Sequence, residues 1–207
     1  MNYRQEYEKW LASPALSEDE KNELKAIAND EKEIENRFYG PLEFGTAGLR
    51  GVLGAGTNRM NIYVIRRATQ AVAQYLNETE LPKTVAIGHD SRIKSDVFAR
   101  EAAAVFAANG ITAYLYPRLE PVPALSFAVR HLHCGLGVCV TASHNPAIYN
   151  GIKVFTAGGR DADETQTGEI ESYIAKVEKP VAEMEYDAAK AQGLIEEIYP
   201  LNEYLDN

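Results

Sequence analysis

Between residues 61 and 177, short apolar strands alternate with amphipathic helices, and this alternation limits the possible folds more than any other feature. Apolar side chains recur on one helical face over 61–77, and residues 84–88, 111–116 and 135–140 are almost continuous apolar runs. Such strands are buried on both faces, so we predict an α/β fold with three α/β/α layers and a mixed, mostly parallel sheet. The same pattern predicts further helices at 96–108, at 122–131 and up to Val177, and a strand at 151–155.

A strongly polar segment, residues 3–37, precedes the first strand and predicts one short and one longer helix. Ser17 and Glu20 are spaced as a capping box that starts the longer helix. We expect this N-terminal helical arm to serve packing or oligomerisation rather than catalysis. We divide the chain into the arm (1–40), an α/β domain (41–180), and a linker with the start of a next domain (181–207).

The charge of the chain is unevenly distributed along its 207 residues. Its formal net charge is −9, yet residues 38–160 carry 12 basic and 7 acidic side chains, an excess of 12 − 7 = +5, and all four histidines. A basic centre within an acidic protein suits a small anionic ligand, and the acidic whole argues against nucleic acid or an anionic membrane as partner.

Cysteine content and hydropathy favour an ordinary cytoplasmic protein. Cys134 and Cys139 both lie in an apolar stretch, without the spacing of zinc ligands, so we expect two buried, reduced thiols. The first ten residues contain no apolar signal core, and no run of ~18 apolar residues occurs in the chain.

The first of three motifs that combine glycine with polar residues is residues 43–51, EFGTAGLRG. Closely spaced glycines allow backbone amides to approach an anion, and the Arg50 guanidinium can contact phosphate through two hydrogen bonds. The segment matches neither the Walker pattern nor Gly-x-Gly-x-x-Gly, so turn glycines beside a surface arginine are the simpler interpretation.

The second motif, residues 88–92 (GHDSR), follows an apolar strand. Asp90 and Arg92 either form a pair that orients neighbouring loops, or Asp90 caps the next turn. Both alternatives are structural rather than catalytic.

The third motif, residues 140–146 (VTASHNP), places Ser143 in a loop directly after an apolar strand. A hydroxyl held there is exposed, as a nucleophile or phosphate carrier must be, and Lys153 lies ten residues later, where it can return to the same site. An Asn-Pro turn with a surface serine is the alternative. We disfavour a hydrolase triad of Ser143 and His144, because Gly-x-Ser-x-Gly is missing and successive side chains seldom meet at hydrogen-bond distance.

Three carboxylates gather between Asp161 and Glu164. They are candidate Mg²⁺ ligands, but Asp161 with Glu164 also fits the cap of a following helix. Capping is our interpretation.

Together and in this order, these segments resemble the α-D-phosphohexomutase family of phosphoglucomutases and phosphomannomutases. The match is carried by the serine loop, by residues 43–51, by GTNRMN at 56–61, and by NGIKV at 150–154. The arm together with residues 58–61 resembles the branch of bacterial α-phosphoglucomutases and phosphopentomutase-like relatives.

The resemblance implies that Ser143 carries a phosphoryl group between glucose 1-phosphate and glucose 6-phosphate, through a bisphosphorylated sugar. It implies Mg²⁺ as cofactor, bound to Ser143 through its phosphate, and glucose 1,6-bisphosphate as activator. The resemblance also implies catalytic roles for Arg50, Lys153 and His144, with Lys153 as general acid/base. It implies that the same three residues and Asn145 bind substrate or phosphate, His144 and Asn145 as neighbours of Ser143 in its loop. Thr46, Asp90 and Arg92 are implied as supporting residues.

The departures from the family pattern limit this expectation. The family has four domains, and neither the Asp-rich Mg²⁺ loop, nor the sugar-reading loop, nor the last phosphate clamp is recognisable in the sequence. We therefore expect one domain of a longer enzyme, inactive alone and partnered by the remaining domains. The substrate alternatives are mannose and pentose phosphates, and a different class is a non-catalytic anion-binding or interaction module.

Overall fold

A computed structural model describes residues 2–45, 48–177 and 180–206. Within these residues one seven-stranded sheet has the order β1-β2-β6-β5-β3-β4-β7. Its strands are β1 (Phe44–Gly45), β2 (Gly48–Val52), β3 (Thr84–His89), β4 (Thr112–Leu115), β5 (Leu136–Val140), β6 (Tyr149–Thr156) and β7 (Ile195–Glu197). The helices are α1 (Tyr3–Ala12), α2 (Glu18–Ala26), α3 (Glu31–Phe38), α4 (Ile62–Glu78), α5 (Ser95–Ala108), α6 (Val122–His131), α7 (Glu164–Ile174), α8 (Tyr186–Ala191) and α9 (Leu201–Leu205).

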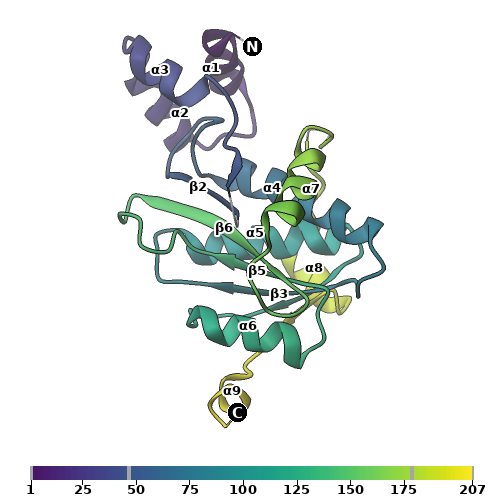
Figure 1. Ribbon diagram of the computed structural model, residues 1–207. Helices are drawn as coiled ribbons and strands as arrows, with labels where there is room; N and C mark the ends of the chain where they lie inside the picture. Colours follow the sequence, from purple (N-terminus) through teal and green to yellow (C-terminus); the bar gives the residue numbers. More distant parts are fainter. Residues whose placement is uncertain (1, 46–47, 178–179, 207) are drawn as a thin grey trace.

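Helices cover both faces of the sheet, which confirms the predicted three-layer α/β/α fold (Figure 1). The apolar faces of α4, α5 and α7 meet one face in the larger core, and α6 packs on the other face in a smaller core. The sheet is mixed, as expected, with parallel β5-β3-β4-β7 pairings and antiparallel β1-β2-β6-β5 pairings. Parallel pairs are therefore half of the pairings. The antiparallel half arises at two places: residues 43–51 lead into β2, and the serine loop connects β5 to the antiparallel strand β6.

Glycines allow the antiparallel strands β2 and β6 to approach closely. A Cβ atom at Gly151 would lie 2.3 Å from the Leu49 carbonyl oxygen, and one at Gly48, whose φ is +153°, would lie 2.1 Å from the Ile152 carbonyl oxygen. Any side chain at either position would collide with backbone. The second part of the segment predicted as turn glycines or a phosphate loop, residues 48–51, is thus in strand β2, and Gly48 allows the close approach to β6.

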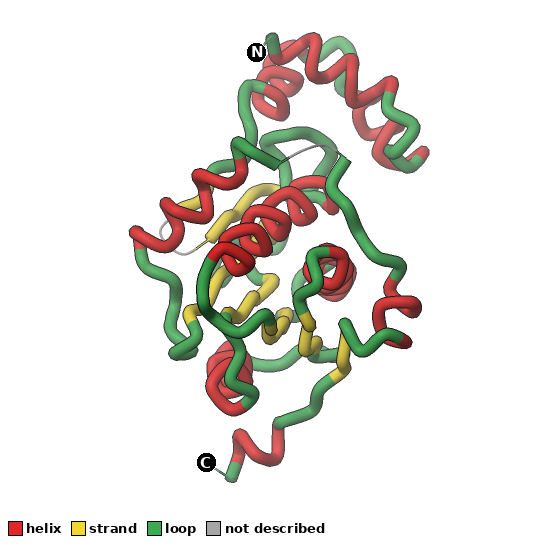
Figure 2. Tube along the Cα trace, turned by 90° about the vertical axis from the view of Figure 1, so that its right-hand side faces the viewer, coloured by secondary structure: helices red, strands yellow, loops and turns green. Residues whose placement is uncertain are grey.

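The N-terminal arm consists of three helices rather than the predicted two. The Ser17–Glu20 capping box is present at the start of α2, but that helix ends at Ala26. Asp30 starts α3, because its side chain accepts a hydrogen bond from the backbone N–H of Glu33. The arm has a small core of its own and lies beyond one end of the sheet, as the turned view in Figure 2 shows.

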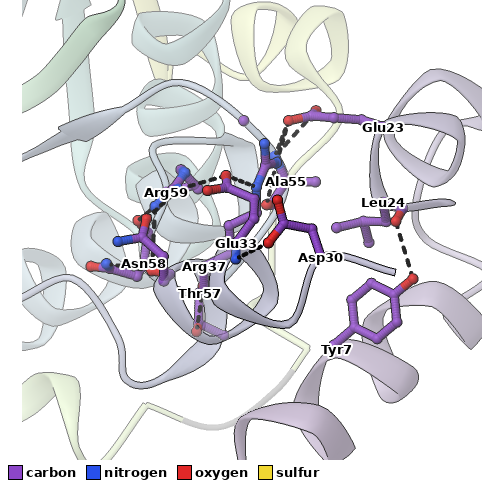
Figure 3. A network of polar contacts seen from close by, with 12 residues as sticks. Tyr7, Glu23, Leu24, Asp30, Glu33, Arg37, Ala55, Thr57, Asn58 and Arg59 are labelled. Atoms are coloured by element: carbon purple, nitrogen blue, oxygen red, sulfur yellow. Dashed lines mark hydrogen bonds and ion pairs between the residues drawn. The ribbon is translucent and has the colours of Figure 1, made fainter. Parts of the chain in front are cut away.

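A network of arginines and glutamates joins the arm to the α/β domain (Figure 3). Arg37 and Arg59 both contact the Glu33 carboxylate, at 2.7 and 3.1 Å, and Arg37 also pairs with Glu23. Arg59 is only 7% exposed. Buried arginines with hydrogen-bonded carboxylates are costly to separate, so this network fixes the arm to the loop before α4.

The segment after residue 180 contains part of the sheet. Strand β7 pairs in parallel with β4, and Ile195 is buried there, while Ala189 of α8 is buried in the larger core. Residues 186–197 therefore belong to the sheet domain and not to a linker, because β7 adds the last strand next to β4 and Ala189 and Ile195 pack into the larger core. The assignment of later residues to a next domain stays a prediction.

None of the helices in the described part of the chain is long and apolar enough to cross a membrane.

Candidate functional site

Ser143 lies in the loop between β5 and β6, at the carboxyl end of β5. Its φ is +54°, a left-handed conformation that costs a residue with a side chain about 1–2 kcal/mol. The backbone N–H of Ser143 donates to the Thr141 hydroxyl at 3.0 Å, which supports the turn. The serine is exposed and held in a conformation that an unconstrained loop would avoid.

Arg92 holds the serine loop from the neighbouring strand end. One terminal nitrogen donates to the carbonyl oxygens of Ser143 and Asn145, both at 2.7 Å, and the other donates to those of Pro146 and Tyr149, at 2.9 and 3.0 Å. Four carbonyls on one planar guanidinium fix the path of the loop, which a lysine could not do with the same geometry.

Asp90 in turn holds Arg92 and the end of β5. Its carboxylate lies 3.3 Å from Arg92 Nε, accepts from the Thr141 hydroxyl at 2.7 Å, and accepts from the Ser95 hydroxyl at 2.9 Å. It also accepts from the Arg92 backbone N–H, as a turn cap does. Asp90 therefore does both things that the sequence suggested: it pairs with Arg92 and it caps the turn that follows.

Arg50 reaches the serine loop from β2. Its side chain donates to the Asn145 side-chain oxygen at 3.4 Å, and the residue lies opposite Gly151 in the antiparallel pairing with β6. Gly151 and Lys153 share one face of β6, so Arg50 and Lys153 emerge on the same face of the sheet.

Lys153 is occupied by a partner that the sequence did not suggest. Its ammonium group lies 2.7 Å from the Asp161 carboxylate, with the two side chains 24% and 53% exposed. The helix cap that we predicted for Asp161 and Glu164 is wrong in its residues, because Asp163 and Gln166 form the capping box of α7. Asp161 faces back to β6 because its backbone bridges to Phe155.

His144 contacts the serine after all. Its Nδ1 lies 3.3 Å from Ser143 Oγ, so the expectation that these successive side chains would not meet is wrong, since the left-handed turn brings them together. Within the described residues His144 has no carboxylate partner to orient it, which a hydrolase triad needs. The contact alone is insufficient for that chemistry.

Two supporting residues, Thr141 and Asn150, were not assigned from the sequence. Thr141 links Asp90 to the Ser143 amide, and Asn150 is fully buried with its amide donating to Ser95 Oγ and to a backbone carbonyl. A polar residue at the end of an apolar strand was the available signal for both. The predicted supporting residue Thr46 lies outside the described residues.

The charges at this edge of the sheet are mostly positive. Arg50, Arg92 and Lys153 contribute three cations, against the two carboxylates of Asp90 and Asp161. Cys139 is buried in the sheet below, and this burial raises the pKa of its thiol to about 12. Both cysteines are buried and free, as predicted.

The fold and the site define an α/β domain that presents an anchored, exposed serine beside cations at the carboxyl edge of its sheet. Residues 41–181, more than half of the chain, match the family described as phosphoglucomutase/phosphomannomutase, alpha/beta/alpha domain I. The chain belongs to this family and contains its first domain, as the motifs predicted.

Relatives support the same assignment. A phosphoglucomutase from Staphylococcus saprophyticus is 41% identical over 73% of this chain, and a probable phosphoribomutase from Schizosaccharomyces pombe is 42% identical over 70%. The crystal structure of a putative phosphomannomutase from Thermus thermophilus superposes on 81% of the chain, with a TM-score of 0.70 and 32% identity. The matched regions cover 27%, 26% and 35% of these three relatives, so the chain corresponds to about a quarter to a third of their length.

Proposed function

We propose that this chain supplies the phosphoserine domain of a phosphohexomutase that interconverts glucose 1-phosphate and glucose 6-phosphate. Ser143 is the residue that carries the phosphoryl group. The observation that carries this proposal is the anchored loop: Ser143 is left-handed, and its own carbonyl oxygen and that of Asn145 accept hydrogen bonds from Arg92. Phosphoryl transfer depends on positioning and on nearby cations, and this loop has both.

The bond changes follow from this arrangement. The Oγ–P bond of phosphorylated Ser143 breaks as a sugar hydroxyl oxygen bonds to phosphorus. The hydroxyl proton passes to a base, and the released Ser143 Oγ takes up a proton to become a hydroxyl again. The bisphosphate then turns over, and its other phosphoryl group returns to Ser143. Arg50, which already contacts the serine loop, is the cation that stabilises charge on the transferring group.

Lys153 is our candidate for the proton transfer, on the same sheet face as Arg50. Its ammonium group, 2.7 Å from the Asp161 carboxylate, can donate a proton or neutralise phosphate. To contact a substrate, the Lys153 ammonium group must first separate from Asp161. His144, in contact with Ser143 Oγ, is a neighbour that orients the hydroxyl or its phosphate.

Magnesium enters the proposal as an ion shared with another part of the enzyme. Within the described residues no group of three or more His, Cys, Asp or Glu side chains is placed to hold a metal ion. The site as described therefore does not fit a complete Mg²⁺ centre, and only the Ser143 phosphate is offered from this loop. We assign no reaction step to the ion.

The same proposal includes four further points. The enzyme is completed by its remaining domains, glucose 1,6-bisphosphate is its activator, it is located in the cytoplasm, and this part alone is inactive. The short coverage of the relatives supports the need for further domains. The phosphoglucomutase relatives favour glucose phosphate as the substrate. Pentose phosphate and mannose phosphate stay alternatives, because one relative is a probable phosphoribomutase and another a putative phosphomannomutase.

Intact-mass analysis tests the proposal on the complete protein that the gene encodes. After incubation with glucose 1,6-bisphosphate and Mg²⁺, we expect one added phosphoryl group, located by peptide mapping at Ser143. Ser143→Ala abolishes it, whereas Ser172→Ala, a change on the exposed surface of α7, does not. A wild-type protein that gains no phosphoryl group favours the non-catalytic module instead.

A further inference from the structure

A cavity of about 470 Å³ lies where the N-terminal arm meets the α/β domain, on elements that do not include the serine loop. Side chains from α1 and the loop after it form one side, and the first turns of α4 together with Pro180 and Val181 form the other. We name it the arm cavity. Its volume is within the range of about 300–1,000 Å³ that holds small organic ligands, and junctions between folding units are common places for such sites.

The walls of the arm cavity are mostly apolar and aromatic. Trp10 and Tyr63 line it and meet edge to face, with ring centroids 5.4 Å apart, and Leu16 and Val64 lie beside them. The Tyr63 hydroxyl donates to the Ala15 carbonyl oxygen at 2.7 Å, so the ring is fixed in place. A flat or apolar molecule fits such walls.

Most charged side chains around the arm cavity already have partners. Arg66 Nε lies 2.6 Å from carboxylate oxygens of both Glu101 and Glu183. Lys9 lies 3.8 Å from the Glu6 carboxylate. These cations do not require a ligand.

Arg67 is different. Its Nε is buried without a hydrogen-bond partner, and its one hydrogen bond among the described residues goes to the Ile174 carbonyl oxygen at 3.1 Å. No ion pair joins it to a carboxylate in the described ranges 2–45, 48–177 and 180–206. Burial lowers the pKa of Arg67, as expected for a desolvated cation that no carboxylate of the described residues neutralises.

We propose that the arm cavity binds a small organic anion, with Arg67 pairing its single carboxylate, sulfonate or phosphate group and Trp10 and Tyr63 contacting its apolar body. An anion beside the Arg67 guanidinium supplies a counter-charge that the described residues do not provide, and a guanidinium is well suited to such a group. This binding is independent of phosphoryl transfer at Ser143, so either proposal can fail without the other.

The probe for this site is 8-anilinonaphthalene-1-sulfonate, which combines aromatic rings with one sulfonate. Trp10 is the sole tryptophan of the chain and lies in the cavity wall, so it reports binding by energy transfer to the probe. We expect saturable binding of one probe per chain with quenching of Trp10, and an unchanged far-ultraviolet circular dichroism spectrum, which shows that the backbone stays folded. N-phenyl-1-naphthylamine, which lacks the sulfonate, is expected to bind at least tenfold more weakly.

Two variants locate the probe. Arg67→Met keeps much of the side-chain length and removes the cation, so we expect at least tenfold weaker binding. Arg118→Met, at an exposed arginine outside the cavity, is the matched control and is expected to change the affinity less than twofold. Ala15→Phe narrows the cavity without changing its charge, and we expect weaker binding there too, even if Arg67→Met does not fold.

The proposal is overturned if the probe binds without saturation, or if the uncharged analogue binds equally well. Equal affinity in the wild type and in a folded Arg67→Met variant also overturns it. If only Ala15→Phe folds, unchanged binding in that variant has the same meaning.

Discussion

Ser143 is one of three non-glycine residues with a left-handed backbone in the described part of the chain, and its φ is +54°. Glycine adopts this conformation without steric cost, whereas alanine pays about 1–2 kcal/mol for it. We therefore expect Ser143→Gly to be more stable than Ser143→Ala by about 0.5–1 kcal/mol, after the greater chain entropy of unfolded glycine is allowed for. Urea unfolding of the two variants measures the difference, and equal or reversed stabilities would show that the turn is not left-handed.

Arg92 is the residue that should matter most for the order of the serine loop. Arg92→Met removes four hydrogen bonds to carbonyls and the pairing with Asp90, and we expect a loss of about 1–3 kcal/mol of unfolding free energy. Hydrogen exchange should rise in residues 141–150 and stay unchanged in α4. Arg118→Met, at a side chain that is 61% exposed, is the control, expected within about 0.5 kcal/mol of wild type. Unchanged exchange in the loop of Arg92→Met would refute the anchoring role.

Sequence predicted the members of the site better than their contacts. Ser143, Arg92 and Asp90 follow strand ends, where a sheet gathers its functional side chains, and the structure joins them by hydrogen bonds. The pairing of Lys153 with Asp161 was not predictable, because it depends on how the chain after β6 folds back on that strand.

At the scale of elements, the contact of the arm with the domain depends on an ionised Glu33. Burial alone would raise the pKa of this carboxyl, but hydrogen bonds and charge from Arg37 and Arg59 outweigh it and hold the pKa below its ordinary value of 4.5. A carboxyl with a lowered pKa in the folded state stabilises the protein above its unfolded pKa, and this stabilisation is lost as pH falls through the folded pKa.

We therefore expect the arm to loosen in acid, beginning as pH falls below about 4.5, the ordinary pKa of this carboxyl. Trp10 packs against Phe38 and Tyr63, at ring distances of 5.8 and 5.4 Å, so its fluorescence follows the docking of the arm. Glu33→Gln should reduce stability at neutral pH and flatten the acid dependence, while the exposed Glu8→Gln on the same arm should not. Identical pH profiles for wild type and Glu33→Gln would contradict this account.

Strand β7 gives a second prediction about elements. Ile195 is 2% exposed in the larger core, so Ile195→Ala should cost about 2–4 kcal/mol of unfolding free energy. Leu119→Ala, at a leucine that is 57% exposed, should cost less than about 0.5 kcal/mol. Chemical denaturation compares the two, and equal costs would mean that residues 186–197 are not part of the sheet domain.

The elements that sequence predicted well are those with strong periodicity. Helices α4, α5 and α6 were located to within about two residues, since their apolar faces are continuous. Strand β2 was not assigned, because glycines carry no side-chain pattern, and β7 is too short and acidic to show one. The break between α2 and α3 was missed because the polar sequence around it is compatible with one continuous helix, whereas Asp30 caps the start of a new one.

At the scale of the whole molecule, the described residues assemble the serine and its cations but not a complete substrate site. The carboxyl edge of the sheet brings together residues from β2, β6 and the ends of β3 and β5, although they are up to about one hundred positions apart in sequence. A basic centre between two acidic ends places the positive charge along the part of the chain that forms this edge.

The central claim is that Ser143 carries a phosphoryl group that can be transferred to a sugar phosphate. The most direct measurement is a chase: the complete protein, labelled with ³²P from glucose 1,6-bisphosphate in the presence of Mg²⁺, is mixed with unlabelled glucose 1-phosphate. We predict that the label leaves the Ser143 peptide and appears in sugar bisphosphate, and that Ser143→Ala never acquires it. Label that stays on the protein, or that persists in Ser143→Ala, would contradict the claim.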